Sequence, residues 1–171
     1  MKIKVEAGPL TCELSALAAL CPSPGLVIAG GAIRDSFIGR PAKDIDLFCL
    51  KGTPSFQADA FLSSIGYEER LITSWGYDVL SGCFGRVTAR HFERPDLTPI
   101  NLVEFAFPPE TEAELIGAFD YTVNAVFLRD GDVFADERFL EDILNRKLRA
   151  VYDNRAIPEY RTRRMNELGF K

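Results

Sequence analysis

Residues 30–48 read GGAIRDSFIGRPAKDIDLF and combine a pair of glycines, an Arg-Asp step and an alternating Asp-Ile-Asp. The apolar run 26–29 stands before the two glycines, which predicts a short buried strand that turns into a helix through about residue 38. Residues 39–41, Gly-Arg-Pro, end that helix, and residues 44–50 alternate as a second strand. This order of elements is typical of an α/β protein.

Asp44 and Asp46 stand on one side of the expected strand 44–50. Side chains at i and i+2 of a strand share a face, so Ile45 and Leu47 turn toward the core instead. Two carboxylates about 7 Å apart repel each other unless a cation lies near them, and their oxygens suit Mg²⁺ or Mn²⁺. An Asp-x-Asp pair is common, and taken alone it favours a plain solvent-facing strand.

The glycine pair favours the metal interpretation. Gly30 and Gly31 follow a strand and open a helix, which is the geometry in which backbone N–H groups can hold an anion. Glycine also lets a phosphate approach the main chain closely. Because one helix and a tight turn separate the glycines from the carboxylates, we expect both at one end of the sheet. A phosphate-binding turn that faces a metal pair indicates a nucleoside triphosphate site.

The remaining elements are expected from periodicity and turn residues. A helix capped by Thr11 is expected over residues 13–20, and a strand meander of β-forming residues over 67–90. The other expected elements are helices over 54–65, 111–119, 139–146 and 157–168, a strand over 100–107, and a hairpin of 124–128 with 133–135.

Residues 30–48 resemble the head-domain signature of the tRNA nucleotidyltransferase (CCA-adding enzyme) and poly(A) polymerase family, which belongs to the DNA polymerase β-like nucleotidyltransferase superfamily. The signature is Gly-Gly, two residues, Arg-Asp, an apolar turn, Gly-Arg and Lys-Asp-x-Asp-Leu. The matching residues are Gly30, Gly31, Arg34, Asp35, Gly39, Arg40, Lys43, Asp44, Asp46 and Leu47. Residues 120–125, DYTVNA, resemble the Asp-Phe-Thr-Ile-Asn-Ala motif of the same family, and residues 139–149 resemble the end of its head domain.

The resemblance implies a polymerase β-like palm fold, with a mixed, partly antiparallel sheet flanked by helices. It implies a nucleotidyltransferase head domain over residues 1–151 and a short neck-like helix over 152–171. The family reaction is in-line attack of an acceptor hydroxyl on the α-phosphorus of an NTP with release of pyrophosphate. Two ions of Mg²⁺ (or Mn²⁺) stabilise the attacking and leaving oxygens.

The resemblance also assigns roles at the metal site. Asp44 and Asp46 are expected to bind both ions, and a third carboxylate on a neighbouring strand is expected to hold the acceptor-side ion or act as base. Glu104 is the first candidate, because a carboxylate within the apolar strand 100–107 is costly to bury without a partner. The candidates that follow it are Asp120, Asp78 and Glu93.

Around the nucleotide, the resemblance implies backbone donors from Gly30 and Gly31 and positive charge from Arg34 and Lys43. The residues expected to bind the nucleotide are Gly30, Gly31, Arg34, Lys43, Asp120 and Asn124. One departure is clear, since the family has Arg-Arg before the second motif where this chain has Ala118-Phe119. The loss of these two cations puts substrate affinity in doubt.

Arg161 and Arg164 are three residues apart on the expected helix 157–168 and therefore share a face. They are candidates for binding an acidic acceptor such as an RNA end. The alternative is that this helix only packs on the head and its arginines face solvent. The single histidine, His91, has polar neighbours and is expected on the surface or in a loop.

Composition sets outer limits on the function. The chain has 171 residues, of which 47% are hydrophobic and 26% charged, and these values are typical of one soluble domain. No apolar run approaches the ~20 residues of a membrane span, and the N-terminus has no secretory signal pattern, so we expect a cytoplasmic protein that does not contact membranes. The net charge of −5 does not favour nonspecific nucleic-acid binding, and the four cysteines are expected to be reduced structural thiols.

The leading hypothesis is an enzyme that moves NMP from ATP or CTP to an RNA 3′ end, a protein or a small molecule. One alternative is the catalytic subunit of a larger RNA-modifying assembly. Another is a degenerate module that binds a nucleotide or a protein partner. Because the family continues into neck, body and tail domains that select bases and hold tRNA, we do not expect this chain alone to add CCA to tRNA. The oligomeric state stays open.

Overall fold

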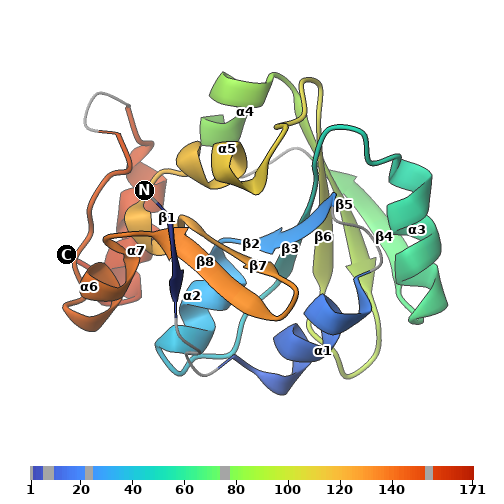
Figure 1. Ribbon diagram of the computed structural model, residues 1–171, viewed down its shortest axis with the longest axis horizontal. Coiled ribbons are helices and arrows are strands. Elements are labelled where there is room, and N and C mark those ends of the chain that lie inside the picture. Colours follow the sequence, from blue (N-terminus) through green and yellow to red (C-terminus); the bar gives the residue numbers. More distant parts are fainter. Residues whose placement is uncertain (1, 6–9, 22–24, 74–77, 153–155) are drawn as a thin grey trace.

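The structure is a computed structural model that describes residues 2–5, 10–21, 25–73, 78–152 and 156–171. Its centre is an eight-stranded sheet with the order β1-β8-β7-β2-β3-β6-β5-β4 (Figure 1). Neighbouring strands run antiparallel except β3 and β6, which run parallel. The expected α/β class with a partly antiparallel sheet is confirmed.

The strands are β1 (Lys2–Val5), β2 (Leu26–Ala29), β3 (Ile45–Cys49), β4 (Glu68–Thr73), β5 (Val87–Glu93), β6 (Ile100–Phe105), β7 (Val126–Arg129) and β8 (Asp132–Asp136). The helices are α1 (Cys12–Leu20), α2 (Gly31–Phe37), α3 (Ser55–Ser64), α4 (Asp78–Phe84), α5 (Glu112–Gly117), α6 (Phe139–Leu144) and α7 (Glu159–Glu167), with a short 3-10 helix η1 (Thr122–Asn124).

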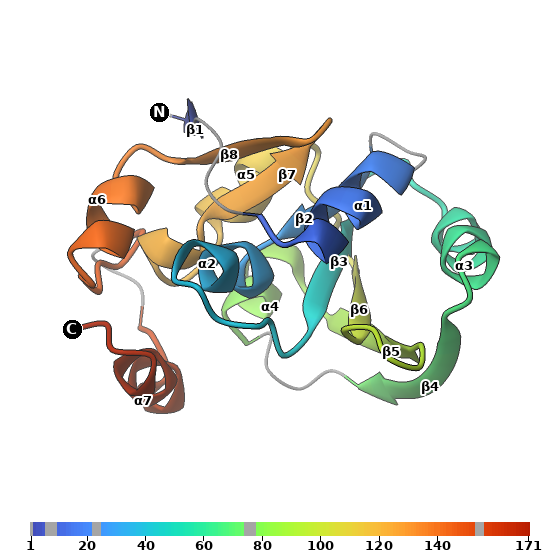
Figure 2. The same ribbon diagram turned by 90° about the horizontal axis from the view of Figure 1, so that it is seen from below.

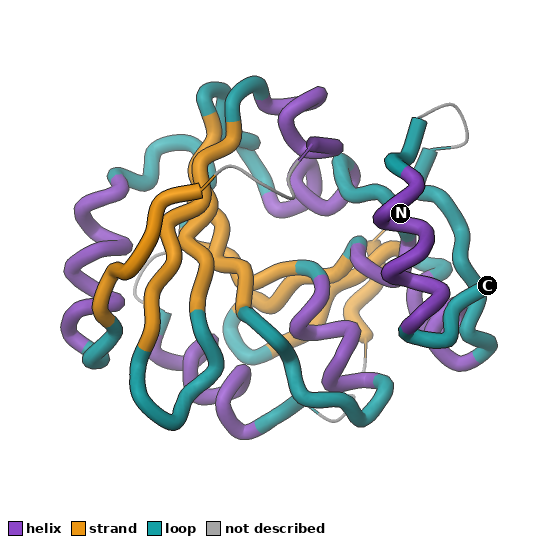
Figure 3. The backbone as a smooth tube through the Cα atoms, turned by 180° about the vertical axis from the view of Figure 1, so that it is seen from behind, coloured by secondary structure: helices purple, strands orange, loops and turns teal. Residues whose placement is uncertain are grey.

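The sheet separates two hydrophobic clusters. Helices α1, α2 and α3 cover one face and bury Leu14, Ile33 and Leu62 against it (Figure 2). Helices α4 and α5 cover the other face with Leu80 and Leu115 (Figure 1). Figure 3 shows from behind how the strands curve between these helices. Helix α7 belongs to neither of these two layers and lies at one edge of the domain (Figure 2).

The C-terminal residues return to the head and fix α7 in place. Met165 of α7 and Phe170 beyond it are buried in the same cluster as α1 and α2. The backbone N–H of Leu148 donates to the carbonyl oxygen of Lys171 at 2.6 Å, and the N–H of Lys171 donates to the carbonyl oxygen of Arg146 at 2.8 Å. These contacts attach α7 to the loop that follows α6.

Most of the expected elements are present. The Thr11 hydroxyl accepts from the N–H of Leu14 at 3.3 Å and caps α1 as predicted. The expected hairpin is β7 and β8, and its turn residues Asp130 and Gly131 both have positive φ, which two-residue hairpin turns need.

The segment 67–90 differs from the prediction. We expected a strand meander, but the structure has β4, then the helix α4, then β5, while residues 74–77 lie outside the described part of the chain. Leu80 and Phe84 are buried one helical turn apart on α4, and this spacing was the signal for the helix. The strand β1 was not predicted, because its partner β8 lies far along the chain.

Within the described ranges, no helix is both long and apolar enough to cross a membrane. The cytoplasmic location stays a prediction.

Candidate active site

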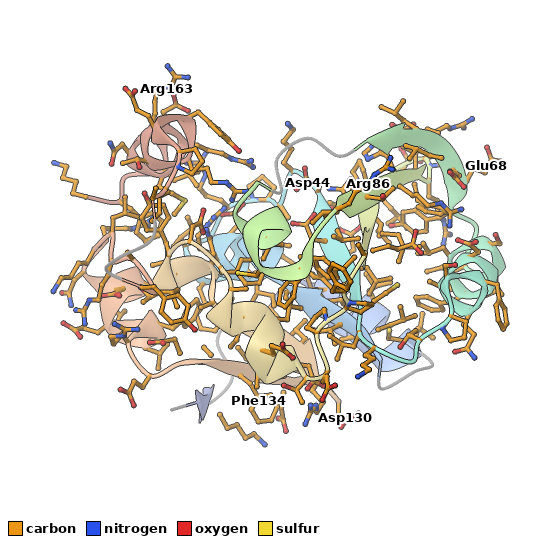
Figure 4. The ribbon with its side chains drawn as sticks, turned by 90° about the horizontal axis from the view of Figure 1, so that it is seen from above. Asp44, Glu68, Arg86, Asp130, Phe134 and Arg163 are labelled. Atoms are coloured by element: carbon orange, nitrogen blue, oxygen red, sulfur yellow. The ribbon has the colours of Figure 1, made fainter. Side chains whose placement is uncertain are left out.

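A cavity of about 480 Å³ lies beside the sheet, with walls from β3, β6 and β5, the first turns of α2, and the helices α4 and α7. Both Asp44 and Asp46 line it, as do Arg161 and Arg164. In the view of Figure 4, Asp44 lies between α7, which carries the outward-pointing Arg163, and β4, which carries Glu68. The aspartates near β3 and the arginines of α7, which are far apart in the sequence, therefore line the same cleft.

Asp46 lies on the cleft face of β3, and Asp44, one residue before the strand begins, lines the same cavity, as the alternation predicts. Both are partly buried, whereas Ile45 and Leu47 are fully buried on the other face. Asp46 Oδ1 accepts a hydrogen bond from Nδ2 of Asn101 on the parallel strand β6 at 3.0 Å. The carboxylate of Asp46 is thus held by a neutral donor at the base of the cleft.

The glycine turn contributes differently from the prediction. Gly30 has φ 85° and ψ −135°, a conformation open to glycine alone, and its N–H donates to the carbonyl oxygen of Val126 at 2.9 Å. A Cβ on Gly30 would lie 3.1 Å from the ring of Phe119. Gly30 therefore shapes the turn with its N–H already bonded, and Gly31 is the glycine that lines the cavity.

A chain of buried and partly buried hydrogen bonds connects α2, η1 and α7. Arg34 Nη1 donates to Asn124 Oδ1 at 2.6 Å, and Asn124 Nδ2 donates to Asp120 Oδ1 at 2.9 Å. Arg161 Nη1 then donates to Asp120 Oδ2 at 2.9 Å. Arg34 also pairs with Asp35, so its charge is already compensated. Four of the predicted site residues (Arg34, Asp120, Asn124 and Arg161) form this one network.

Arg161 and Arg164 both line the cleft, but they differ in their surroundings. Burial lowers the pKa of the Arg161 guanidinium, but the Asp120 carboxylate and the Tyr160 hydroxyl outweigh this effect, and the net pKa is raised. Arg161 is therefore a fixed cation paired to the head. Arg164 and Lys43 are exposed residues of the lining, with room to meet a ligand.

Glu104 is not part of this cleft. It lies on β6, where Asn101, Val103 and Phe105 face the cleft side and the alternate residues face α1 and α3. The pKa of Cys49, which lies in the cluster under α1 and α3, is raised by burial first and by the charge of the Glu104 carboxylate second. The structure does not bring Glu104 together with Asp44 and Asp46.

Of the other carboxylate candidates, Asp120 lines the cleft within the network, and Glu93 contacts His91. The side chain of Asp78 lies outside the described part of the structure.

Two residues of the cleft were not selected from the sequence. Asn101 lies beside Asp46, and its Oδ1 is 2.9 Å from Nδ1 of His91 on β5. His91 does not lie in a loop: it is a residue of β5, and its side chain, which is 28% exposed, lines the cavity. Its position depends on the register of β5 and β6, which its polar sequence neighbours do not reveal.

Ala118 and Phe119 stand where the resembled family has two arginines, and both are buried. Phe119 lines the cavity and packs edge-on against Phe48, with ring centroids 5.8 Å apart. An apolar wall therefore replaces two cations on this side of the cleft.

The carboxylates of the cleft match the needs of a divalent ion, Mg²⁺. Among the described residues, no group of three or more His, Cys, Asp or Glu side chains gathers around one point. Asp44 and Asp46 are two carboxylates on one face of a cleft, which fits Mg²⁺, because this ion binds through one or two carboxylates and keeps water and phosphate as its other ligands.

The mixed sheet, the glycine turn and the paired carboxylates define a nucleotidyltransferase head domain, and the comparisons identify its family. No family model matches the chain. The human mitochondrial CCA tRNA nucleotidyltransferase 1 is 33% identical over 138 residues, which cover 74% of this chain and 29% of that protein. Its zebrafish counterpart is 32% identical over the same length. The chain thus spans less than a third of these relatives' length.

Solved structures agree in fold. The Thermotoga maritima CCA-adding enzyme complexed with tRNA matches with a TM-score of 0.59 and 12% identity, over 89% of this chain and 37% of that one. A tRNA nucleotidyltransferase complexed with a primer tRNA and an ATP analog matches with a TM-score of 0.54 and 18% identity, over 74% and 35%. The chain carries the head domain of the tRNA nucleotidyltransferase family.

Proposed function

We propose that this chain is the catalytic head of a metal-dependent nucleotidyltransferase that transfers NMP from ATP or CTP to a hydroxyl of an RNA end. The observation that carries the proposal is the meeting of Asp44 and Asp46 with the Gly31 turn and the α7 arginines in one cavity of about 480 Å³. The tRNA-acting relatives favour RNA over a protein or small-molecule acceptor.

In the proposed reaction the acceptor oxygen forms a bond to the α-phosphorus while the bond to the bridging oxygen breaks and pyrophosphate leaves. Divalent ions held by Asp44 and Asp46 would supply charge stabilisation for these oxygens. Asn124 retains one amide hydrogen and one lone pair beyond its bonds to Arg34 and Asp120, and these suit the sugar or base edge of the nucleotide. Lys43 and Arg164 would attract phosphates from the exposed part of the lining.

We further propose the division into a head over residues 1–151 and a neck-like helix over 152–171. Helix α7 follows the head in the chain and contributes Arg161 to the wall of the cleft, as a neck would.

The first test is calorimetry with ATP and CTP, with and without Mg²⁺. Nucleotide binding should require the metal, and the double variant Asp44→Asn/Asp46→Asn should lose this metal-dependent binding without unfolding. Glu104→Gln is the matched control, because it removes a charge from the other face of the same sheet. Metal-independent binding that survives in the double variant would reject the proposed site.

The second test identifies the acceptor. Purified protein, Mg²⁺ and labelled NTPs are incubated with total RNA, and label should appear in RNA. Arg164→Ala should reduce it, whereas Arg163→Ala should not, because Arg163 points away from the cleft on the same helix (Figure 4). The affinity for single-stranded RNA should also become less sensitive to salt in Arg164→Ala. The slope of log K against log salt concentration should become shallower by about 0.7 for each lost phosphate contact.

A nucleotide-binding module without catalysis is the second candidate, and the apolar pair Ala118-Phe119 is the observation that favours it. Metal-dependent nucleotide binding without label transfer to RNA, protein or small molecules, in the presence of Mg²⁺ or Mn²⁺, would select this function.

A further inference from the structure

Three side chains from three adjacent strands form a row across the floor of the cleft, which we call the cross-strand row. Asp46 on β3 is paired in register with Asn101 on β6, and Asn101 is paired in register with His91 on β5. All three residues line the cavity. The row is continuous, with Asn101 Nδ2 3.0 Å from Asp46 Oδ1 and Asn101 Oδ1 2.9 Å from His91 Nδ1.

The chemistry of the three groups fixes the direction of both hydrogen bonds. An ionised carboxylate only accepts, so the amide nitrogen of Asn101 must face Asp46. The amide oxygen then faces His91 and only accepts as well, which requires a proton on Nδ1. His91 Nε2 is 3.3 Å from Glu93 Oε1 at the outer end of the row. The carboxylate therefore orients the amide, and the amide oxygen requires the proton on Nδ1.

We propose that Asn101 and His91 are positioning residues that hold the carboxylate of Asp46 in the orientation that binds a divalent cation. The metal-binding part of this inference rests on the proposed function. The hydrogen-bond directions in the cross-strand row do not depend on it. Without the hydrogen bond from His91 Nδ1, only Asp46 orients the amide of Asn101, so the amide and the carboxylate are no longer held in place from β5. Hydrogen bonds to ligating carboxylates tune metal affinity in this way.

The order of the row is tested without any metal. Because the chain has a single histidine, its imidazole nitrogens are assigned directly in a long-range ¹H–¹⁵N spectrum of labelled protein. At about pH 8 we expect a proton on Nδ1 in the wild type, and a shift toward the Nε2-protonated form in Asn101→Ala. A wild-type spectrum with the proton on Nε2 alone, or one that Asn101→Ala leaves unchanged, would overturn the row.

The effect on the metal is tested by titration of Mn²⁺, followed by the electron paramagnetic resonance signal of the free ion. Asn101→Ala and His91→Leu should weaken Mn²⁺ binding about 10-fold, the lower end of the range for hydrogen-bond partners of metal ligands. His91→Asn should restore most of the affinity, because its amide nitrogen can occupy the position of Nδ1. Glu104→Gln, on β6 but facing the other side of the sheet, should change nothing.

The outcomes separate the two proposals. Wild-type protein that does not bind Mn²⁺ would overturn the proposed function and the metal role of the row, while the nitrogen spectrum would still decide its order. If Asn101→Ala and His91→Leu bind Mn²⁺ as tightly as the wild type does, the positioning role is overturned and the proposed function is not. Equal loss in His91→Leu and His91→Asn would contradict the proposed proton on Nδ1.

Discussion

Removal of the Arg161 side chain should destabilise the fold, although the residue lines the cleft and is partly exposed. Asp120 is 2% exposed and would lose its cation, while keeping the donors Asn124 Nδ2 and the N–H of Tyr121. Breaking a buried pair from one side costs about 3–5 kcal/mol. Since the Arg161 side chain is 20% exposed, we expect about 3 kcal/mol for Arg161→Ala, at the lower end of that range.

In a chain of this size each kcal/mol changes Tm by about 2–4 °C, so Arg161→Ala should lower Tm by about 6–12 °C. Arg164→Ala is the matched control, because Arg164 is an exposed cation on the same helix, and its effect should stay within about 0.5 kcal/mol. Thermal unfolding followed by circular dichroism measures both. A decrease for Arg161→Ala no larger than that for Arg164→Ala would refute the reasoning.

A double-mutant cycle with Asp120→Asn separates the pair from general packing effects. If the two side chains act on each other, the combined loss should be smaller than the sum of the single losses by about 0.5–3 kcal/mol. Additive losses would mean that Arg161 stabilises the protein by contacts other than the one with Asp120.

Gly30→Ala should destabilise the protein by about 1–3 kcal/mol in urea unfolding, because only glycine adopts its backbone angles without strain. Gly39→Ala should destabilise it less, because the new methyl meets no other atom and only the positive φ is strained. Exposed Cys12 and Cys83 should react with a thiol reagent in the native protein at pH 8, and buried Cys49 should not. Burial raises the pKa of Cys49 from 9.0 to about 12, so the native state holds this proton more tightly than the unfolded state, and unfolding measured at increasing pH should show stability falling above about pH 9. Phe170→Ala should cost about 3–5 kcal/mol, because the ring is fully buried, and a loss below 1 kcal/mol would contradict its place in the core.

The sequence was sufficient where structure depends on neighbouring residues. The turn at Gly30, the end of α2 and the side of β3 that carries Asp44 and Asp46 follow from local sterics and from strand alternation. The Asp120 motif was located by resemblance. Arg161, however, was predicted to bind an acidic acceptor molecule, and in the structure it pairs with Asp120. A salt bridge between residues 41 positions apart has no local signal.

Strand register explains the principal differences at the site. The sequence indicates that residues 100–107 form a strand, but it does not indicate which residue of that strand stands beside Asp46. The register places Asn101 there, and Glu104, an odd number of residues further on, consequently faces the other side. The same register brings His91 into the cleft. A shift of one residue would exchange these faces, so propensity and composition could not decide between them.

The position of β2 in the sheet has a consequence for synthesis. β2 lies between β3, which follows it closely in the chain, and β7, which begins at Val126. A ribosome releases residues from the N-terminus onward, so the strand that carries the aspartates can pair with β2 and β6 while the acceptor of the Gly30 N–H has yet to be made. Phe170 and the cleft wall from α7 emerge later than all of these strands. A nascent chain therefore has an open carboxylate pair well before it has an enclosed cavity, and the cavity is complete only after α7 has been made.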